Sequence, residues 1–240
     1  MIKLNINDET SRLRSVLLGT ARSNGGVPSL DEAYDPKSML HIKEKTYPKE
    51  EDMLKEIEAV EAVFIQVFRP KVIQNYNQIF ARDIGFVIDD VFIKANILPD
   101  REQELDAIQH VLSQIDPEKI IRFPEEAHIE GGDVMPHGDY IFVGTYRGED
   151  YPDYIIARTN MKAVACLEKT FPNKKVVSFN LRKSNTNPYE NALHLDCCFQ
   201  PVGENMAILH KNGFLVEEEY QWLVDHFGSE NVFEITAEEM

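Results

Sequence analysis

The stretch Asn191-Ala-Leu-His-Leu-Asp-Cys-Cys-Phe199 is the starting point for interpreting this chain. It reads as an extended strand, in which alternate side chains share a face, so His194, Asp196 and Cys198 are expected to point the same way. An imidazole beside a carboxylate on one surface can transfer protons. The stretch therefore predicts a polar site at the opening of a strand.

Two earlier stretches have the same design, with a short polar motif at the start of an apolar strand. They are Phe80-Ala-Arg-Asp-Ile-Gly-Phe-Val-Ile88 and His128-Ile-Glu-Gly-Gly-Asp-Val-Met135. The glycine pair in the second stretch permits a tight approach of the backbone. We expect the three strand openings to converge on one site.

Each motif opens a repeating order of hairpin, helix and strand. The units begin at Asp83, Asp133 and Asp196. In the first unit the predicted hairpin, helix and closing strand span residues 86–93, 105–115 and 119–123. In the second unit they span residues 134–143, 160–171 and 176–179, and in the third unit residues 198–209, 217–227 and 232–235. Repeated units of one design pack side by side, here around an axis with the three aspartates near its centre. The pattern predicts an α/β fold and one domain over residues 1–240.

The segment before the first repeat predicts a partial unit. Residues 14–19 read as a buried strand and residues 20–47 as a long loop, which is often functional. An amphipathic helix is expected from Lys49, because apolar residues recur at steps of three and four; they are Met53, Ile57, Val60, Phe64 and Val67. Residues 69–73 are expected to return as a short strand.

The charge balance excludes several classes of partner. The 240 residues include 25 Lys and Arg against 41 Asp and Glu, a formal net charge of -16. Such a chain repels nucleic acid and anionic membrane surfaces and favours small cations. No apolar run approaches the roughly 20 residues of a membrane span, and three cysteines do not form a disulfide framework. We expect a soluble, cytoplasmic protein.

The candidate site has an excess of negative charge, which requires a cation if it is buried. Its residues are Asp83, Glu130, Asp133, His194 and Asp196. A guanidinium suits such a site, because its planar fork of N–H donors pairs bidentately with carboxylates. A metal ion is the alternative, since His128 with Glu130 and His194 with Asp196 have the spacing of ligands in two-histidine, one-carboxylate iron sites.

The adjacent cysteines Cys197 and Cys198 are predicted to be small core residues, because free cysteine packs as a modest hydrophobe. Four residues separate His194 from Cys198, roughly 13 Å along a strand. Direct proton transfer between these two side chains is therefore excluded.

Four short motifs, in this order along the chain, resemble those of the guanidino-group modifying enzymes. They are Phe80-Ala-Arg-Asp83, Glu130-Gly-Gly-Asp133, Arg158-Thr-Asn160 and His194-Leu-Asp196. That superfamily includes arginine deiminases, dimethylarginine dimethylaminohydrolases and amidinotransferases. The resemblance implies a pentein-type α/β propeller of ββαβ modules with pseudo-fivefold symmetry.

The resemblance also implies roles for individual residues. His194 matches the general acid and base, Glu130 and Asp196 match acids that hold the substrate guanidinium, and Glu130 also assists proton transfer. The matching substrate-binding residues are Asp83 for the guanidinium, Asn77 and Phe80 for the walls of the guanidine pocket, and Arg158 for the substrate α-carboxylate. Arg82 and Asp133 are expected to brace the site. No cofactor and no metal are expected.

In these enzymes a cysteine thiolate attacks the guanidinium carbon and a covalent thiouronium intermediate forms. That cysteine lies near the family's C-terminus in a glycine-rich segment, which this sequence does not show before Met240. We expect a chain without its last module, and unpaired strand edges that favour homo-oligomers. The activity expected is that of an amidinotransferase or a C–N hydrolase on arginine or a derivative; the alternative is a non-catalytic binder of arginine-like cations.

Overall fold

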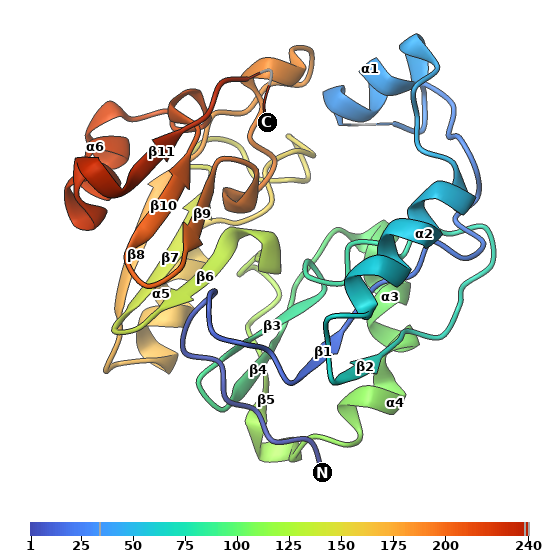
Figure 1. Cartoon of the computed structure of the whole chain (residues 1–240), viewed down its shortest axis with the longest axis horizontal. Coiled ribbons are helices and arrows are strands. Elements are labelled where there is room, and N and C mark those ends of the chain that lie inside the picture. The colour runs from blue at the N-terminus through green and yellow to red at the C-terminus, as the bar shows by residue number, and fades with distance from the viewer. Residues whose placement is uncertain (34, 238, 240) are drawn as a thin grey trace.

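Three sheets of three strands repeat one connectivity along the chain (Figure 1). The computed structural model describes residues 1–33, 35–237 and 239, so residue 34 of the predicted loop and the end at Met240 lie outside the described residues. In each sheet two strands form an antiparallel hairpin, and a third strand, reached through helical segments, pairs parallel to the second. The predicted ββαβ repeat is therefore confirmed.

The bounds of the elements follow the three predicted units. The first sheet contains β3 (Gly85–Ile88), β4 (Val91–Lys94) and β5 (Ile120–Arg122), with α3 (Glu102–Ala107) and α4 (Gln109–Leu112) in the connection. The second contains β6 (Val134–His137), β7 (Tyr140–Thr145) and β8 (Lys175–Asn180), with α5 (Met161–Thr170). The third contains β9 (Phe199–Val202), β10 (Met206–Leu209) and β11 (Val232–Glu234), with α6 (Glu217–Phe227).

The helix predicted over residues 105–115 is divided into α3 and α4. Ile108 lies at the junction with φ -102° and ψ 3°, outside the helical region, and its side chain is fully buried. Leu105, Leu112 and Ile115 are buried with it in one apolar cluster. The apolar spacing thus located the buried face correctly but did not reveal the break.

The N-terminal unit differs most from expectation. Strand β1 (Ser15–Leu17) pairs in parallel with β2 (Gln66–Phe68), and α2 (Glu50–Glu61) connects them. The strand predicted at residues 69–73 is wrong: the helix ends at Glu61, a turn follows it, and the strand lies at Gln66–Phe68, so Phe64 and Val67 fall outside the helix predicted for them. The loop prediction is wrong for α1 (Pro36–Glu44), where Asp35 caps the helix by accepting a hydrogen bond from the Ser38 N–H and Pro36 occupies the first turn.

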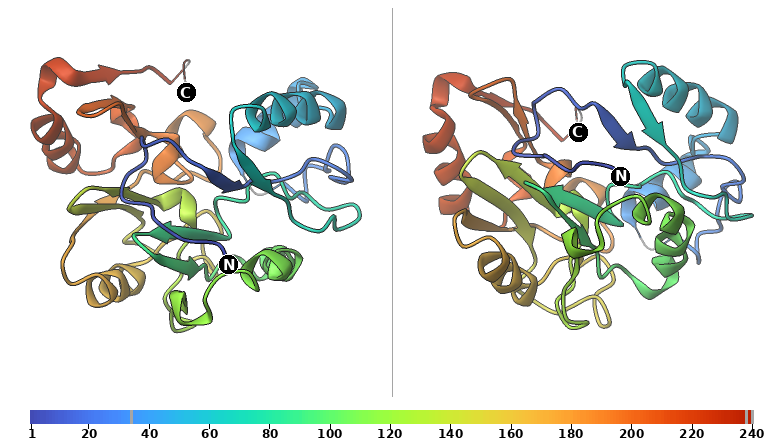
Figure 2. Two further views of the ribbon diagram at one scale, coloured as in Figure 1. Left: turned by 60° about the horizontal axis from the view of Figure 1, so that its bottom comes forward. Right: turned by 90° about the horizontal axis from the view of Figure 1, so that it is seen from below.

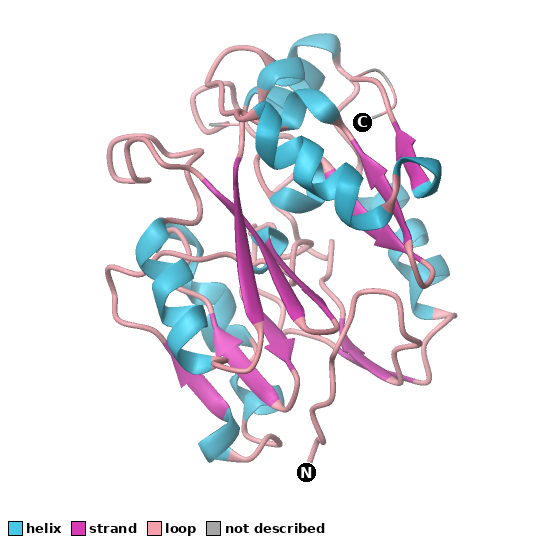
Figure 3. Ribbon diagram, turned by 90° about the vertical axis from the view of Figure 1, so that its left-hand side faces the viewer, coloured by secondary structure: helices cyan, strands magenta, loops and turns pink. Residues whose placement is uncertain are grey.

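Apolar contacts join neighbouring sheets. Ile93 of β4 and Ile141 of β7 belong to one buried cluster, and Phe142 of β7 and Phe199 of β9 belong to another. Because the sheets are packed side by side, the helices lie toward the periphery and the strand openings lie near the middle of the molecule (Figures 1 and 3). This packing positions the site.

The N-terminal segment crosses the hairpin turns of two sheets (Figure 2). Ile6 and Asp89 exchange two backbone hydrogen bonds of 2.9 and 2.7 Å, and the Gly138 N–H donates to the Asn7 carbonyl at 2.9 Å. The segment thus connects the first and second sheets. Within the described ranges, no helix combines the length and apolarity that a membrane crossing requires.

Candidate active site

Asp83, Glu130 and His194 meet at one buried site, although three different modules supply them. The His194 Nε2 lies 2.7 Å from Glu130 Oε2, and its Nδ1 lies 3.8 Å from Asp83 Oδ1. All three residues are buried, with exposed fractions of 6, 1 and 5%. The three openings therefore converge, as the sequence predicts.

The stretch around His194 is a turn and not a strand, which corrects the prediction that His194, Asp196 and Cys198 share a face. Leu195–Cys197 forms a 3₁₀ turn, in which the Cys197 N–H donates to the His194 carbonyl at 3.2 Å. Consequently His194 and Cys198 are buried, whereas the Asp196 side chain is 32% exposed. The strand begins only at Phe199.

Two arginines of the chain itself pair with the acidic residues. The Arg158 Nη1 lies 3.1 and 3.0 Å from the two carboxylate oxygens of Glu130, and its Nε donates to the Ile155 carbonyl at 2.9 Å. Arg101 donates from Nη1 to Asp83 Oδ2 at 2.8 Å and from Nε to Glu104 Oε1 at 2.7 Å. The negative charge of the site is thus partly compensated within the chain.

Sequence reasoning missed Arg101 and Glu104. The available signal in the sequence was the spacing: Glu104 follows Arg101 by three residues and adjoins the apolar Leu105. In the structure Glu104 is only 1% exposed. A carboxylate in that position requires a cation.

Glu130 and His194 form an ion pair. Burial raises the pKa of Glu130, but the charge of Arg158 and the hydrogen bond of His194 outweigh it and lower the pKa to about 2. Burial lowers the pKa of His194, whereas Asp83 and the bond to Glu130 raise it to about 9. At neutral pH the imidazole is therefore protonated and can donate a proton.

Asp133 and Gly132 hold the His194 residue in place. Burial raises the pKa of Asp133 to about 6, and its Oδ1 accepts a 2.9 Å hydrogen bond from the Leu195 N–H. A Cβ on Gly132 would lie 2.8 Å from His194 Cγ and 3.0 Å from Asp83 Oδ1. Glycine is required there because any side chain would occupy the imidazole's position.

Asp196 forms its ion pair with Arg82, whose Nε lies 3.6 Å from Asp196 Oδ2. Arg82 also donates to the carbonyls of Gly131 at 3.2 Å and Val134 at 3.0 Å, and to Glu9 of the N-terminal segment at 3.0 Å. Arg82 thus connects three parts of the chain, consistent with the bracing role expected for it.

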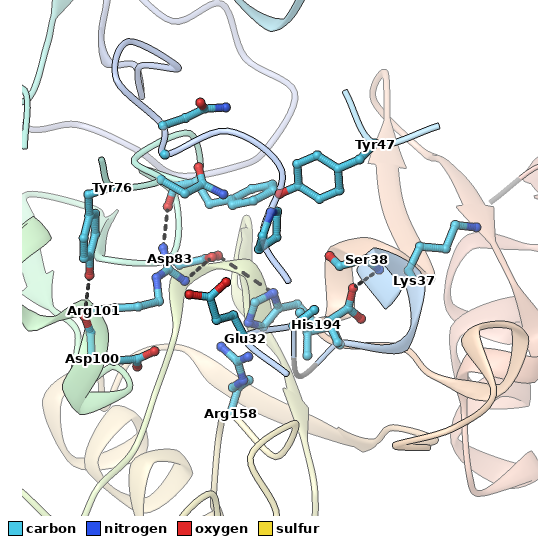
Figure 4. A pocket seen from close by; sticks show the side chains of 18 of the residues that line it. Glu32, Lys37, Ser38, Tyr47, Tyr76, Asp83, Asp100, Arg101, Arg158 and His194 are labelled. Carbon is cyan, nitrogen blue, oxygen red and sulfur yellow. Dashed lines mark hydrogen bonds and ion pairs between the residues drawn. The ribbon is translucent and has the colours of Figure 1, made fainter. Parts of the chain in front are cut away.

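A cavity of about 930 Å³ opens onto these groups (Figure 4). Asn77, Phe80, Asp83, Arg158, His194 and Asp196 all line it. Residues 24–28, Lys37 of α1 and Tyr47 contribute the opposite wall, so the predicted long loop and its helix cover the site. The volume lies within the range of small-molecule pockets. Glu130 is not among the residues that line the cavity; its carboxylate contacts Arg158 and His194, which do line it, so the expected contact of Glu130 with the substrate guanidinium stays a prediction.

The three cysteines are free thiols, and Cys197 also lines the cavity. Burial, followed by the charge of Asp196, raises the pKa of Cys197 to about 12, and burial raises that of Cys198. These thiols remain protonated at neutral pH and are weak nucleophiles. Cys166 lies on α5, where it packs against an apolar cluster.

The same acidic groups and His194 lie close enough together to hold a metal ion. Ligand atoms of Asp83, Glu130 and His194 lie within 4.8 Å of one another, but Arg101 and Arg158 already pair with the two carboxylates. The spacing argument paired His128 with Glu130, but the group that could hold a metal does not include His128, whose Nδ1 lies 2.8 Å from Asp150 Oδ1. Both carboxylates thus already have cationic partners within the chain.

Comparison with known proteins identifies the family. The family model described as N,N dimethylarginine dimethylhydrolase, eukaryotic, matches residues 29–240. The chain belongs to this dimethylarginine dimethylhydrolase family. It is also 31% identical over 136 residues to an uncharacterised protein, YkgA, of Bacillus subtilis; the match covers 55% of this chain and 40% of that relative.

Solved structures share the fold of this dimethylarginine dimethylhydrolase family member. An inosamine-phosphate amidinotransferase of Streptomyces griseus has a TM-score of 0.68 at 11% identity, covering 96% of this chain and 75% of that one. The substrate-bound N-terminal domain of ArgZ, a cyanobacterial arginine dihydrolase, has a TM-score of 0.68 at 14% identity, covering 92 and 75%. A dimethylarginine dimethylaminohydrolase adduct with S-methyl-L-thiocitrulline has a TM-score of 0.56 at 20% identity, covering 80 and 68%. The chain thus has the pentein fold of the guanidino-modifying superfamily, as the sequence motifs predict.

Proposed function

We propose that this chain binds arginine or an arginine derivative and supplies the acid–base and cation-binding groups for a reaction at the guanidinium carbon. The observation that carries the proposal is the His194–Glu130 ion pair, 2.7 Å long, whose imidazole lines the cavity together with Asp83. Asp83 and Asp196 offer carboxylates to the guanidinium, and Asn77 and Phe80 form the walls beside it.

In the proposed reaction, a thiolate sulfur attacks the guanidinium carbon and a C–S bond forms. The C–N bond to the departing amine then breaks, the His194 imidazolium gives its proton to that amine, and a thiouronium remains. Water, deprotonated by His194, next adds to this carbon, so that the C–S bond breaks and a ureido product leaves. Alternatively, a second amine accepts the amidino group.

The proposed reaction requires a cysteine thiolate as its nucleophile. Cys197 and Cys198 have raised thiol pKa values, and Cys166 packs on α5, so the chain's cysteines do not match the role. This observation favours a second candidate function, a binder of arginine-like cations without turnover. Arg158, fully buried against Glu130, is proposed to reach the substrate carboxylate in either case.

The test is titration calorimetry with arginine, asymmetric dimethylarginine, agmatine and glycine, followed by assays for ureido product and for amidino transfer to glycine. Binding of a guanidinium compound with turnover supports the enzyme, and binding without turnover supports the binder. If none of the guanidinium compounds binds at millimolar concentration, both proposals are wrong. A Glu130→Gln variant, which lacks the His194–Glu130 ion pair, is the control and is expected to bind the guanidinium compounds more weakly if binding occurs at this site.

We also propose a cytoplasmic location. The three cysteines are free thiols, which suits a reducing compartment.

A further inference from the structure

The loop that precedes His194 places Lys183 against the backbone next to His194. The Ala192 N–H donates to the Arg182 carbonyl at 2.9 Å, which closes the excursion over residues 182–192. The Lys183 ammonium then donates to two successive carbonyls, those of Ala192 at 2.9 Å and Leu193 at 2.6 Å. These carbonyls belong to the two residues directly before His194.

The backbone directly after His194 is held by a negatively charged group, the Asp133 carboxylate. The Leu195 N–H, directly after His194, donates to the buried carboxylate of Asp133 at 2.9 Å. The backbone of His194 is thus held by a cation acting on the preceding carbonyls and by an anion acting on the following amide. Hydrogen bonds to charged groups are about twice as strong as neutral ones, so both attachments resist rotation of the turn.

The imidazole has little freedom between these two attachments. Its Cγ and Nδ1 lie against Gly132, at 2.8 and 2.9 Å from where a Cβ would stand, and its Nε2 meets Glu130 at 2.7 Å. Small rotations of the backbone would move a ring nitrogen by an ångström or more, and a displacement of this size costs about 10²-fold in rate at a reacting centre.

We propose that Lys183 is a positioning residue for His194: its ammonium and the Asp133 carboxylate hold the turn on both sides of the imidazole, so that Nε2 faces Glu130. Lys183 acts through the backbone and does not touch the substrate. The proposal deepens the function proposed above and rests on it for its effect on turnover. Its structural content does not depend on turnover.

The test compares Lys183→Met with the wild-type protein by NMR titration of the His194 imidazole. Lys183 also lowers the pKa of Asp133, so the titration is followed above about pH 7.5, where Asp133, with a pKa of about 6, stays ionised. Under that condition, removing a nearby positive charge raises the imidazole pKa, whereas loosening the Nε2 contact with Glu130 lowers it toward the ordinary value. The expected result is a fall of about one pH unit or more, equivalent to a tenfold change in proton affinity. An unchanged or higher value in the folded variant would overturn the proposal.

Two further variants control the comparison. Lys183→Arg keeps donors beneath the carbonyls and is expected to recover at least half of the shift; recovery of none of it contradicts the positioning role. Lys211→Met removes an exposed lysine that pairs with Glu217 and is expected to leave the His194 titration unchanged. Lys183→Leu, which likewise has no donor for the two carbonyls, replaces the methionine variant if that one does not fold, with the same criteria.

An activity measurement separates this proposal from the proposed function. If the wild-type protein turns over a guanidinium compound, Lys183→Met is expected to lower kcat about tenfold or more with little change in KM. If the wild-type protein has no activity, the function fails while the NMR comparison still decides the role of Lys183.

Discussion

The guanidinium of Arg101 lies 2.8 Å from the carboxylate of Asp83, the residue proposed to hold the substrate guanidinium. Glu104 fixes Arg101 from the other side at 2.7 Å. An internal cation thus competes for the acid that a cationic substrate requires. Replacing Arg101 and Glu104 by Gln together leaves Asp83 without this partner while keeping the net charge.

The Arg101→Gln/Glu104→Gln variant is therefore expected to bind agmatine on the order of tenfold more tightly, about 1.4 kcal/mol. Agmatine is the suitable probe because it has a guanidinium and no carboxylate. Titration calorimetry measures the change, with Glu104→Gln alone as the control that keeps Arg101. Equal or weaker binding by the double variant would show that Arg101 does not compete at Asp83.

Arg158→Met is expected to destabilise the protein by about 3–5 kcal/mol, because it removes the main partner of the buried Glu130 carboxylate. Urea denaturation measures the loss. Lys55→Met, which breaks an exposed pair with Asp52, is the control and should change stability by less than about 1 kcal/mol. A second change, Glu130→Gln, should recover part of the loss; no recovery would mean that the charge of Glu130 is not the cause.

The raised pKa of His194 predicts a stability that depends on pH. Since the pKa is about 9 in the folded protein against an ordinary 6.5, the contribution of His194 is complete below pH 6.5 and is lost as the pH rises through 9. The difference in unfolding free energy between wild type and His194→Gln should fall over this window by about 3 kcal/mol. Denaturation at pH 6 to 10 tests this.

The Glu130→Gln background is the control for that experiment. The bond to Glu130 is one of the causes of the raised pKa, so the decrease between pH 6.5 and 9 should shrink in this background. A decrease of the same size with and without the Glu130 charge would contradict the ion pair.

Local patterns in the sequence were sufficient for most elements of the fold. The periodicity over residues 217–227 gave α6 with both of its ends, and the turn at Asp89-Asp90 gave the first hairpin. Helix α1 was missed because it has few apolar residues and so shows no clear periodicity, although Asp35 and Pro36 are a helix start signal. Side-chain periodicity measures burial, and α1 buries little.

The parts of the site that sequence reasoning missed depend on contacts between distant residues. The turn after His194 is held by Asp133, which is 62 residues away in the chain, so the local alternation of Leu195 and Asp196 suggested a strand instead. Arg101 pairs with Asp83 across 18 residues. Charge arithmetic predicted a cation in the site, but it could not tell an internal arginine from a ligand.

Gly132→Ala is expected to displace the imidazole of His194, because the new methyl would lie 2.8 Å from Cγ and 2.9 Å from Nδ1. The ring then moves away from Glu130, so the NMR titration of His194 should fall from about 9 toward its ordinary value while the protein remains folded. Gly148→Ala is the matched control, since the three atoms nearest to its methyl would all belong to the side chain of Tyr146 and not to the site. If His194 titrates alike in Gly132→Ala and Gly148→Ala, its imidazole does not pack against Gly132, and the claim that glycine is required there is wrong.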